Sequence, residues 1–165
     1  MQKAILGKEG DYTIRCAEAA DVPSVIRVNA ATLPEHYSDY FYYEILNEFP
    51  NTFIVADLKG EIVSYVMCRT EYGLSVMRRF GLARKGHIIS VATMEGHRGK
   101  GIGTSLIKRA MEELSKEGCK EVFLEVRVTN DDAVRLYRKL NFQVTGTMQG
   151  YYKDGESAYL MAQQL

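Results

Sequence analysis

Residues 96–104 read GHRGKGIGT and place glycines at the alternating positions 99, 101 and 103. The apolar segment His87–Thr93 precedes this turn and predicts a β-strand. A helix is predicted after the turn, because apolar residues recur there at helical spacing and Gly118 ends the pattern. Its apolar face consists of Leu106, Ile107, Ala110, Met111 and Leu114. Glycines before a helix let backbone N–H groups and the positive end of the helix dipole approach an anion, so this stretch predicts a phosphate or pyrophosphate site.

Two common phosphate-binding motifs do not match the turn. The P-loop motif requires Ser or Thr directly after its lysine, whereas Lys100 is followed by Gly101. The dinucleotide-binding motif G-x-G-x-x-G requires glycine where this chain has Thr104. Arg98 and Lys100 add positive charge to the turn. A flexible connector with two solvated cations is the alternative interpretation of the turn taken alone.

Length and composition exclude several classes of protein. The 165 residues fit one domain, 1–165, with residues 1–11 as an N-terminal extension of unassigned role. Lys plus Arg and Asp plus Glu number 21 each, so the net charge does not favour nucleic-acid binding, although it leaves room for a local basic patch. No apolar run is long enough to span a bilayer, and no signal peptide is visible. The three cysteines are too few and too scattered for a disulfide framework, which indicates a reducing, cytoplasmic environment.

The remaining patterns predict an α/β fold. Strands and helices are expected in the order β-α-α-β-β-β-α-β-α-β-β, which predicts a mixed, curved β-sheet with helices on both faces. Asp21 is expected to cap the first helix, and Asn130 or Asp131 the last one. Residues 71–86 are expected to form a polar excursion between two strands. The expected strands cover residues 12–16, 53–56, 62–68, 87–93, 122–128, 144–152 and 158–163.

A second motif lies one β-α unit later, where Asn130-x-x-Ala133-x-x-Leu136-Tyr137 leads to Asn141-Phe142. Together with R-x-x-G-x-G at 98–103, it resembles the GNAT (Gcn5-related) N-acetyltransferase superfamily. The resemblance implies that acetyl-CoA is the co-substrate, that no metal is required and that the turn holds the pyrophosphate through backbone amides. It also implies a strand backbone that meets the pantetheine arm, an Asn near the cofactor and a Tyr near its sulfur. The implied cofactor-binding residues are Val91, Ala92, Thr93, Arg98, Gly99, Lys100, Gly101, Ile102, Gly103, Thr104, Asn130 and Tyr137.

Outside this core, the sequence resembles a more specific group within the superfamily. The segments LPEHY at 33–37, EVRVTN at 125–130 and YYKDGESAYLM at 151–161 resemble the archaeal N-terminal α-amino acetyltransferases, relatives of the NatA catalytic subunit and of ribosomal-protein acetyltransferases. This implies an enzyme that acetylates the N-terminal α-amine of proteins or nascent peptides, with proximity to the ribosome as a further expectation. No direct contact with nucleic acid or membrane is expected. Ser64 departs from the superfamily, in which many members have glycine on the third strand.

Acetyl transfer requires a neutral amine and an acceptor for its proton. An α-amine has a pKa of about 7.7–8.0, so roughly a tenth to a fifth is neutral at pH 7 and a modest base suffices. Glu125 lies on the polar side of an otherwise apolar strand and is the first candidate base. His87 begins the neighbouring strand, and histidine side chains move protons near neutral pH. The structural alternatives are an ion-paired strand carboxylate and a structural histidine, and two such ligands do not make a zinc site.

The other candidate residues have a structural alternative as well. Tyr137 is the acid for the departing CoA thiolate according to the resemblance, but its spacing also fits simple packing in the core. Asn130 fits a helix cap as well as a cofactor contact. Acceptor binding is expected in the 33–37 loop and the last hairpin, where a carboxylate could dock a positive N-terminus and tyrosines could line a peptide backbone. The acceptor-binding candidates are Glu35, Tyr37, Tyr151 and Tyr152.

Three other functions remain open at this level. The same fold could acetylate a small amine or a lysine side chain instead of a protein N-terminus. A non-catalytic acyl-CoA-binding module is the second alternative, and the candidate catalytic residues Glu125 and Tyr137 argue against it. A dinucleotide-binding protein is the third, and the glycine spacing argues against it.

Overall fold

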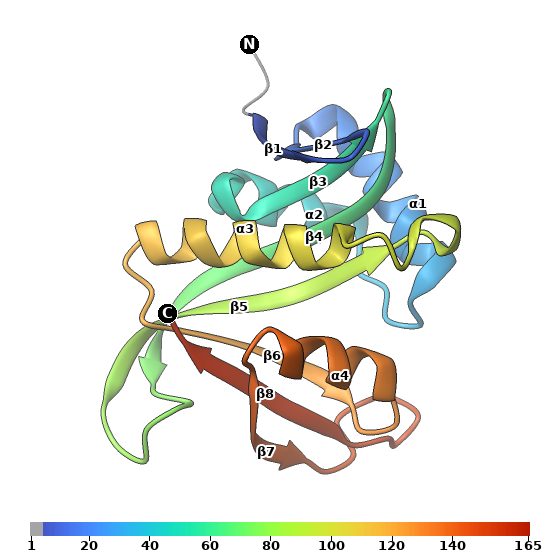
Figure 1. Cartoon of the computed structure of the whole chain (residues 1–165). Helices are drawn as coiled ribbons and strands as arrows, with labels where there is room; N and C mark the ends of the chain where they lie inside the picture. The colour runs from blue at the N-terminus through green and yellow to red at the C-terminus, as the bar shows by residue number, and fades with distance from the viewer. Residues whose placement is uncertain (1–4) are drawn as a thin grey trace. The chain divides into compact units, whose positions relative to one another are not determined.

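A computed structural model describes residues 5–165 and divides the chain into two units. Unit 1 comprises the residues up to Arg69 together with Ile88–Glu113, and unit 2 comprises Thr70–His87 and Leu114–Leu165. The eight strands of the described residues are hydrogen-bonded in the order β1-β2-β3-β4-β5-β6-β8-β7 (Figure 1). This mixed sheet and its α-helices confirm the predicted α/β class. Residues 1–4 of the N-terminal extension lie outside the described residues.

Unit 1 is built mainly from antiparallel strands. Its elements are β1 (Ile5–Glu9), β2 (Tyr12–Cys16), α1 (Val22–Thr32), α2 (Asp39–Glu48), β3 (Phe53–Leu58), most of β4 (Glu61–Leu74), the second half of β5 (Leu82–Thr93) and most of α3 (Ile102–Lys116). Short 3-10 helices cover Ala19–Asp21, Pro50–Thr52 and Glu95–His97. Strands β1 to β4 pair antiparallel in succession. Lys59 and Gly60 have φ values of 52° and 94° and close the β3–β4 hairpin that their sequence predicts.

Both faces of the sheet in unit 1 are covered. Phe53, Val55 and Tyr65 pack with the buried sides of α1 and α2 into one apolar cluster. Ile54 and Ala56 alternate with the cluster residues along β3 and are also fully buried, so they face the opposite side. Helix α3 crosses that side of the sheet (Figure 1). The buried residues of α3 in unit 1 are Ile102, Leu106, Ile107 and Ala110.

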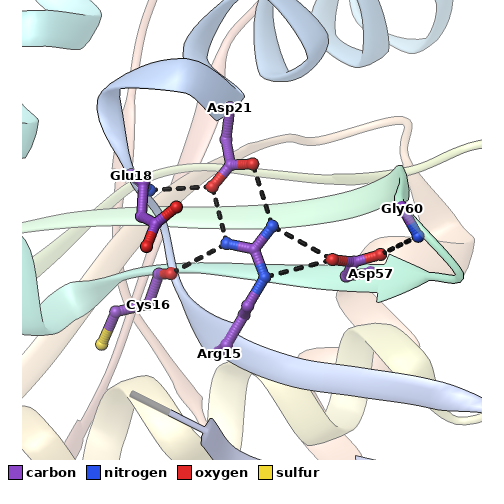
Figure 2. Close-up of polar contacts among 6 residues, drawn as sticks. All are labelled: Arg15, Cys16, Glu18, Asp21, Asp57 and Gly60. Carbon is purple, nitrogen blue, oxygen red and sulfur yellow. Dashed lines mark hydrogen bonds and ion pairs between the residues drawn. The ribbon is translucent and has the colours of Figure 1, made fainter. Parts of the chain in front are cut away.

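A buried arginine joins three segments of unit 1. Figure 2 shows the Arg15 guanidinium between Asp21, at 2.6 and 2.9 Å, and Asp57, at 3.1 and 3.2 Å. Arg15 is 2% exposed, and hydrogen bonds with both carboxylates raise its pKa further. The expected helix cap at Asp21 is wrong in this respect, because its carboxylate binds Arg15 and the N–H of Glu18 and makes no cap bond to α1. A charged donor forms a stronger bond than a neutral amide, so the ion pair replaces the cap.

Unit 2 holds the parallel strand pair. Besides the adjoining parts of β4 and β5, it contains β6 (Glu121–Arg127), α4 (Asp131–Lys139), β7 (Gln143–Met148) and β8 (Ala158–Gln164). β5 pairs parallel with β6 from Lys85 to His87, because α3 provides the crossover that a parallel connection needs. β6 with β8 and β8 with β7 pair antiparallel. Gly86 lies against α3, where an added Cβ would be 2.5 Å from a methyl carbon of Leu114.

Two expected boundaries were wrong, and part of the segment left without a prediction forms a strand. Ile5–Glu9 of the unassigned extension forms β1, which pairs with β2. The expected polar excursion at 71–86 is mostly strand, because β4 continues to Leu74 and β5 begins at Leu82; hairpin backbone bonds form whatever the polarity of the side chains. The strand expected over 144–152 ends at Met148, and Gly150 follows with a φ of 61° that strands do not adopt.

The apolarity of the helices and the state of the cysteines are two features of the whole described chain. Among residues 5–165, none of the helices has both the length and the apolarity needed to cross a membrane. Cys16, Cys68 and Cys119 are free thiols, and burial raises the pKa of Cys16 and Cys119. A raised pKa keeps a thiol protonated and unreactive, so these two cysteines are poor nucleophiles.

Candidate functional site

The glycine-rich turn of unit 1 precedes helix α3 as the sequence predicts. Gly99 and Gly101 have φ values of 75° and 81°, a region that residues with a Cβ rarely adopt. Added Cβ atoms at Gly99 would meet nothing within 4 Å, and at Gly101 only the Glu9 carboxylate at 3.5 Å. The glycines are therefore required by the backbone conformation, and the space beside Gly99 is open. Such a turn can present backbone N–H groups to a phosphate.

Polar side chains fix this turn to its neighbours within unit 1. Arg98 Nε donates to the backbone oxygen of Thr93 at 3.0 Å, so this cation ties the turn to the end of β5. Ser105 Oγ donates to Glu9 Oε2 at 2.8 Å, which places a carboxylate from β1 beside the first turn of α3. Lys100 Nζ lies 3.4 Å from the hydroxyl of Tyr12. These contacts hold the turn in place, and sequence reasoning missed the part played by β1.

The strand predicted to meet the pantetheine arm is held from β4. Ser64, the departure from the superfamily pattern, donates to the backbone oxygen of Ala92 at 2.8 Å and shares a second hydrogen bond with Thr93 Oγ1 at 2.8 Å. Met94 N–H donates to the Val63 oxygen at 2.8 Å. The hydroxyl at position 64 therefore orders the end of β5, a role that a glycine could not have.

A buried polar network holds the loop that carries Glu35. Asn29 Nδ2 donates to the backbone oxygen of Glu35 at 3.1 Å and to the hydroxyl of Tyr65 at 3.0 Å. The Tyr65 hydroxyl shares a 2.6 Å hydrogen bond with Ser90 Oγ on β5, and burial raises its pKa. Tyr37 donates its hydroxyl to the Ile89 oxygen at 3.2 Å. Both candidate acceptor residues of this loop are thus anchored to β5 inside unit 1.

His87 and Glu125 form a direct pair in unit 2. His87 Nε2 lies 2.7 Å from Glu125 Oε2, and the side chains are only 11% and 14% exposed. The imidazole stacks on Phe123, with ring centroids 4.5 Å apart and planes 5° apart. Its second nitrogen, Nδ1, is buried without a hydrogen-bond partner among the described residues. The two candidate residues are therefore hydrogen-bonded to each other, and both groups can take part in proton transfer.

The last helix carries the two remaining cofactor candidates. Asn130 Oδ1 accepts from the Ala133 N–H at 3.2 Å, so the predicted helix cap is confirmed. Tyr137 is buried, with its ring edge-on to Phe142 at 5.8 Å. Burial raises the pKa of Tyr137 to about 12, which keeps its hydroxyl protonated at neutral pH.

Tyr151 and Tyr152 lie in the loop between β7 and β8 and pack edge-on, 5.0 Å between centroids. Arg127 on β6 fixes this loop, because its guanidinium lies 4.0 Å over the Tyr152 ring and binds Asp154 at 2.8 Å and Glu156 at 2.6 Å. Backbone and Arg127 hydrogen bonds lower the pKa of Asp154, and hydrogen bonds with Thr129 and Arg127 lower that of Glu156. The role of Arg127 could not be predicted from its neighbours in sequence, because its acidic partners lie in the remote segment 154–156.

Comparison with known proteins identifies the chain. The Acetyltransferase (GNAT) family matches residues 22–142, which include the turn and the three catalytic candidates His87, Glu125 and Tyr137. The chain belongs to the GNAT acetyltransferase family. It is 46% identical over 157 residues to an N-alpha-acetyltransferase of Sulfolobus acidocaldarius, and the match covers 94% of each protein.

Solved GNAT structures share the fold over nearly the whole chain. Ard1 from Thermoplasma volcanium superposes with a TM-score of 0.80 at 28% identity, covering 94% of this chain and 98% of that one. A chain of a NatC complex bound to Gag peptide and CoA gives a TM-score of 0.84 at 26% identity, covering 94% and 99%. The predicted GNAT-like fold is therefore confirmed. Within residues 5–165, no group of three or more His, Cys, Asp or Glu side chains is arranged to hold a metal ion.

Proposed function

We propose that this GNAT chain transfers the acetyl group of acetyl-CoA to the N-terminal α-amine of proteins or nascent peptides. One observation carries the proposal: near-complete alignment, at 46% identity, with an N-alpha-acetyltransferase. A second such enzyme, from Saccharolobus solfataricus, is 42% identical over the full length of both proteins. The sequence-based prediction of an N-terminal acetyltransferase is confirmed at this level. The residue roles below are proposals.

Unit 1 holds the cofactor in this proposal. The backbone amides of residues 99–104 bind the pyrophosphate, and the positive end of α3 stabilises its charge. The backbone of Val91, Ala92 and Thr93 pairs with the pantetheine arm like an added strand. The glycine conformations support the first role, and the hydrogen bonds from Ser64 to this strand support the second. No metal ion has a part in this scheme.

Unit 2 provides proton transfer. The amine nitrogen bonds to the acetyl carbon, the C–S bond breaks, and the amine loses a proton while the thiolate is stabilised as it leaves. Glu125 is the proton acceptor, directly or through a water molecule, and His87 orients its carboxylate. Tyr137 donates a hydrogen bond from its hydroxyl to the thiolate, and its raised pKa supports this because the hydroxyl stays protonated. Asn130 caps the helix that carries Tyr137 and contacts the cofactor.

Acceptor selection is assigned to anchored loops in each unit. The Glu35 carboxylate and the Tyr37 ring contact the first residues of the peptide, while Tyr151 and Tyr152 line its backbone. The hydrogen bonds that Asn29 and Arg127 make support this, because a fixed loop can discriminate between substrates that differ by one group. A cytoplasmic location, a single functional domain over 1–165 and work near the ribosome complete the proposal.

The central experiment compares acceptors. Purified protein and acetyl-CoA are incubated with peptides that vary in their first two residues, and products are identified by mass spectrometry. We expect acetylation of free α-amines and none of an N-terminally blocked peptide with an internal lysine. A lysine amine near pKa 10.4 is neutral about once in a few thousand molecules, so it requires roughly 3.5 kcal/mol more assistance than an α-amine. Faster acetylation of the blocked lysine peptide or of free small amines would contradict the proposed function and would indicate a lysine or small-amine acetyltransferase.

Substitution of Gly101 by valine is expected to weaken CoA binding about tenfold or more, equivalent to about 1.4 kcal/mol. The added side chain would stand where the turn approaches the pyrophosphate. Because Gly101 has a φ of 81°, valine also strains the backbone, and Gly60→Val supplies the matched control at a φ of 94° in open space. Both variants should lose thermal stability, but only Gly101→Val should lose affinity in calorimetric titrations with CoA. Equal CoA affinities in the two variants would exclude this turn as the pyrophosphate site.

Replacement of Glu35 by valine is expected to redistribute activity among acceptors. The change removes a carboxylate that favours small or polar first residues, so kcat/KM for Ser- and Ala-starting peptides should fall relative to Met-Leu peptides. The size should be about 1–3 kcal/mol, as for one pocket contact. Competitive acetylation of a mixed pool measures the ratio, and Glu44→Val, at an exposed position of α2, is the control. Identical product ratios for Glu35→Val and wild type would transfer the specificity role to the tyrosines.

A further inference from the structure

The β4–β5 hairpin of unit 2 exposes four large apolar side chains by more than half of their surface. Tyr72 is 72% exposed, Leu74 73%, Phe80 78% and Leu82 54%. We call residues 72–84 the hairpin tip (green to yellow-green in Figure 1). Several large exposed apolar side chains within one hairpin can mark an interaction surface.

The hairpin tip is also basic. Residues 74–85 read LSVMRRFGLARK and contain four cations and no carboxylate, in a chain whose net charge is zero. Arg78, Arg79 and Arg84 are exposed. Lys85 is buried, and its ammonium donates to the Leu74 oxygen at 2.6 Å. Three arginines of the tip are therefore exposed, and the Arg79 guanidinium lies 5.3 Å from the Phe80 ring centroid.

The tip is fixed before any partner binds. Glu121 of β6 is buried, and its carboxylate accepts hydrogen bonds from Ser75 Oγ and from the Val76 N–H, the latter at 2.9 Å. Ser75 N–H donates to the Gly81 oxygen at 3.0 Å and closes the loop. Arg78 Nη2 donates to the Leu82 oxygen at 3.0 Å. A loop held in this way loses little conformational entropy on binding.

We propose that the hairpin tip binds single-stranded RNA. Arg78, Arg79 and Arg84 contact phosphates, while Tyr72 and Phe80 are stacking platforms for bases. This combination of guanidinium groups and exposed aromatic rings is the recognition chemistry of single-stranded nucleic acid. The Arg79 guanidinium already lies 5.3 Å from the Phe80 ring centroid, so charge and stacking surface are presented together.

Two other partners fit the tip less well. Insertion of Phe80 into a membrane would carry Arg78 and Arg79 of the same closed loop toward the apolar interior, which costs free energy. A second copy of the chain would bring two sets of like charges together, which costs free energy. RNA complements the charge and uses the aromatic rings. The proposal goes beyond the acetyltransferase function and does not depend on it.

Fluorescence anisotropy with a labelled, unstructured RNA of about 20 nucleotides tests the proposal on the full chain. We expect saturable binding that weakens about 7- to 20-fold between 50 and 200 mM salt, as for two or three phosphate contacts. Arg78→Glu with Arg79→Glu should abolish binding and leave acetylation of free peptides unchanged. Phe80→Ala should weaken binding about fivefold or more with an unchanged salt slope, because it removes stacking alone. Arg27→Glu with Lys108→Glu makes the same charge change at exposed positions of unit 1 and should bind RNA like wild type.

Three results would overturn the proposal. The first is no RNA binding by wild type at 50 mM salt. The second is equal loss of binding in the Arg78/Arg79 and the Arg27/Lys108 variants, which would indicate net charge rather than the tip. The third is sedimentation with anionic phosphatidylglycerol vesicles without RNA binding, which would assign the tip to a membrane surface. Because peptide acetylation is measured in parallel, a failed RNA experiment is distinguishable from a failed acetyltransferase assignment.

Discussion

Glu125→Gln is expected to lower kcat about 100-fold or more, the range for loss of a general base. Glutamine keeps the size of the side chain and can still hydrogen-bond to His87, which lies 2.7 Å away, so the pair should survive in shape. What is lost is a group that accepts a proton. Steady-state kinetics with a Ser-starting peptide measure the effect, and CoA affinity should barely change. Glu112→Gln on the exposed face of α3 is the matched control and should retain wild-type turnover.

The pH dependence of this variant separates base catalysis from simple positioning. Without a base, only peptide molecules whose α-amine is already neutral can react. The rate of the Glu125→Gln variant should therefore rise nearly tenfold per pH unit below pH 7.7, following the amine, and level off above pH 8. Restored activity at high pH supports the base role. A folded variant with wild-type kcat at pH 7 would contradict it. The neutral fraction of the substrate amine would then be sufficient for the reaction without a base.

His87 should contribute less than Glu125. Its Nε2 faces the carboxylate, while its Nδ1 is buried without a partner among the described residues, so the imidazole is placed to orient Glu125 rather than to meet an amine. We expect His87→Gln to lower kcat by a smaller factor than Glu125→Gln. The double variant should lose less than the product of the two factors, because both residues act in one step. Multiplicative losses would show that they act separately.

The parts of the site that depend on local sequence were predictable. The glycine turn, its strand and its helix follow one another along the chain, and each has a short-range signal: apolar alternation, glycine spacing and helical periodicity. The Asn130 cap is likewise decided within four residues, since its partner is the Ala133 N–H. Such features require no knowledge of which distant segments meet.

The supporting contacts were not predictable, because they join segments far apart in sequence. Arg127 binds Glu156, Asn29 binds Tyr65, and Arg15 binds Asp57, and nothing near either partner indicates the other. From the sequence alone, an arginine on a strand is predicted to be a solvent-exposed charge, because the fold that places a carboxylate beside it is not known. The Asp21 cap was wrong because the Arg15 guanidinium, six residues away, binds the Asp21 carboxylate and is itself held by the distant Asp57.

The β4–β5 hairpin was mispredicted for a different reason. Its strands carry arginines and glycine between apolar residues, so neither alternation nor an apolar run marks them. The hairpin is held by its own backbone bonds and by Glu121, a carboxylate contributed by β6. The exposed side chains of this hairpin do not determine its fold. Their composition can therefore suit a binding partner, which is consistent with the RNA surface proposed above.

Tyr137→Phe is expected to lower kcat about 10²- to 10³-fold, the range for loss of one donor to a developing negative charge. The pKa of Tyr137 is raised to about 12, whereas a thiol has a pKa of about 8.5, so complete proton transfer to the CoA thiolate would be uphill by about 5 kcal/mol. Tyr137 should therefore stabilise the thiolate by hydrogen bonding rather than by protonating it fully.

Two measurements distinguish this role of Tyr137 from packing. The phenylalanine ring preserves the contact with Phe142, so the melting temperature and CoA affinity of Tyr137→Phe should stay near wild type while kcat falls. Tyr42→Phe is the matched control, because Tyr42 is a buried tyrosine whose hydroxyl has no hydrogen-bond partner among the described residues. A donor is lost only when pH rises through its pKa, so with a pKa of about 12 the wild-type kcat should not decline up to pH 10, where about 1% of the phenol is ionised. Wild-type turnover by Tyr137→Phe, or a decline of kcat near pH 8, would assign thiolate stabilisation to another group.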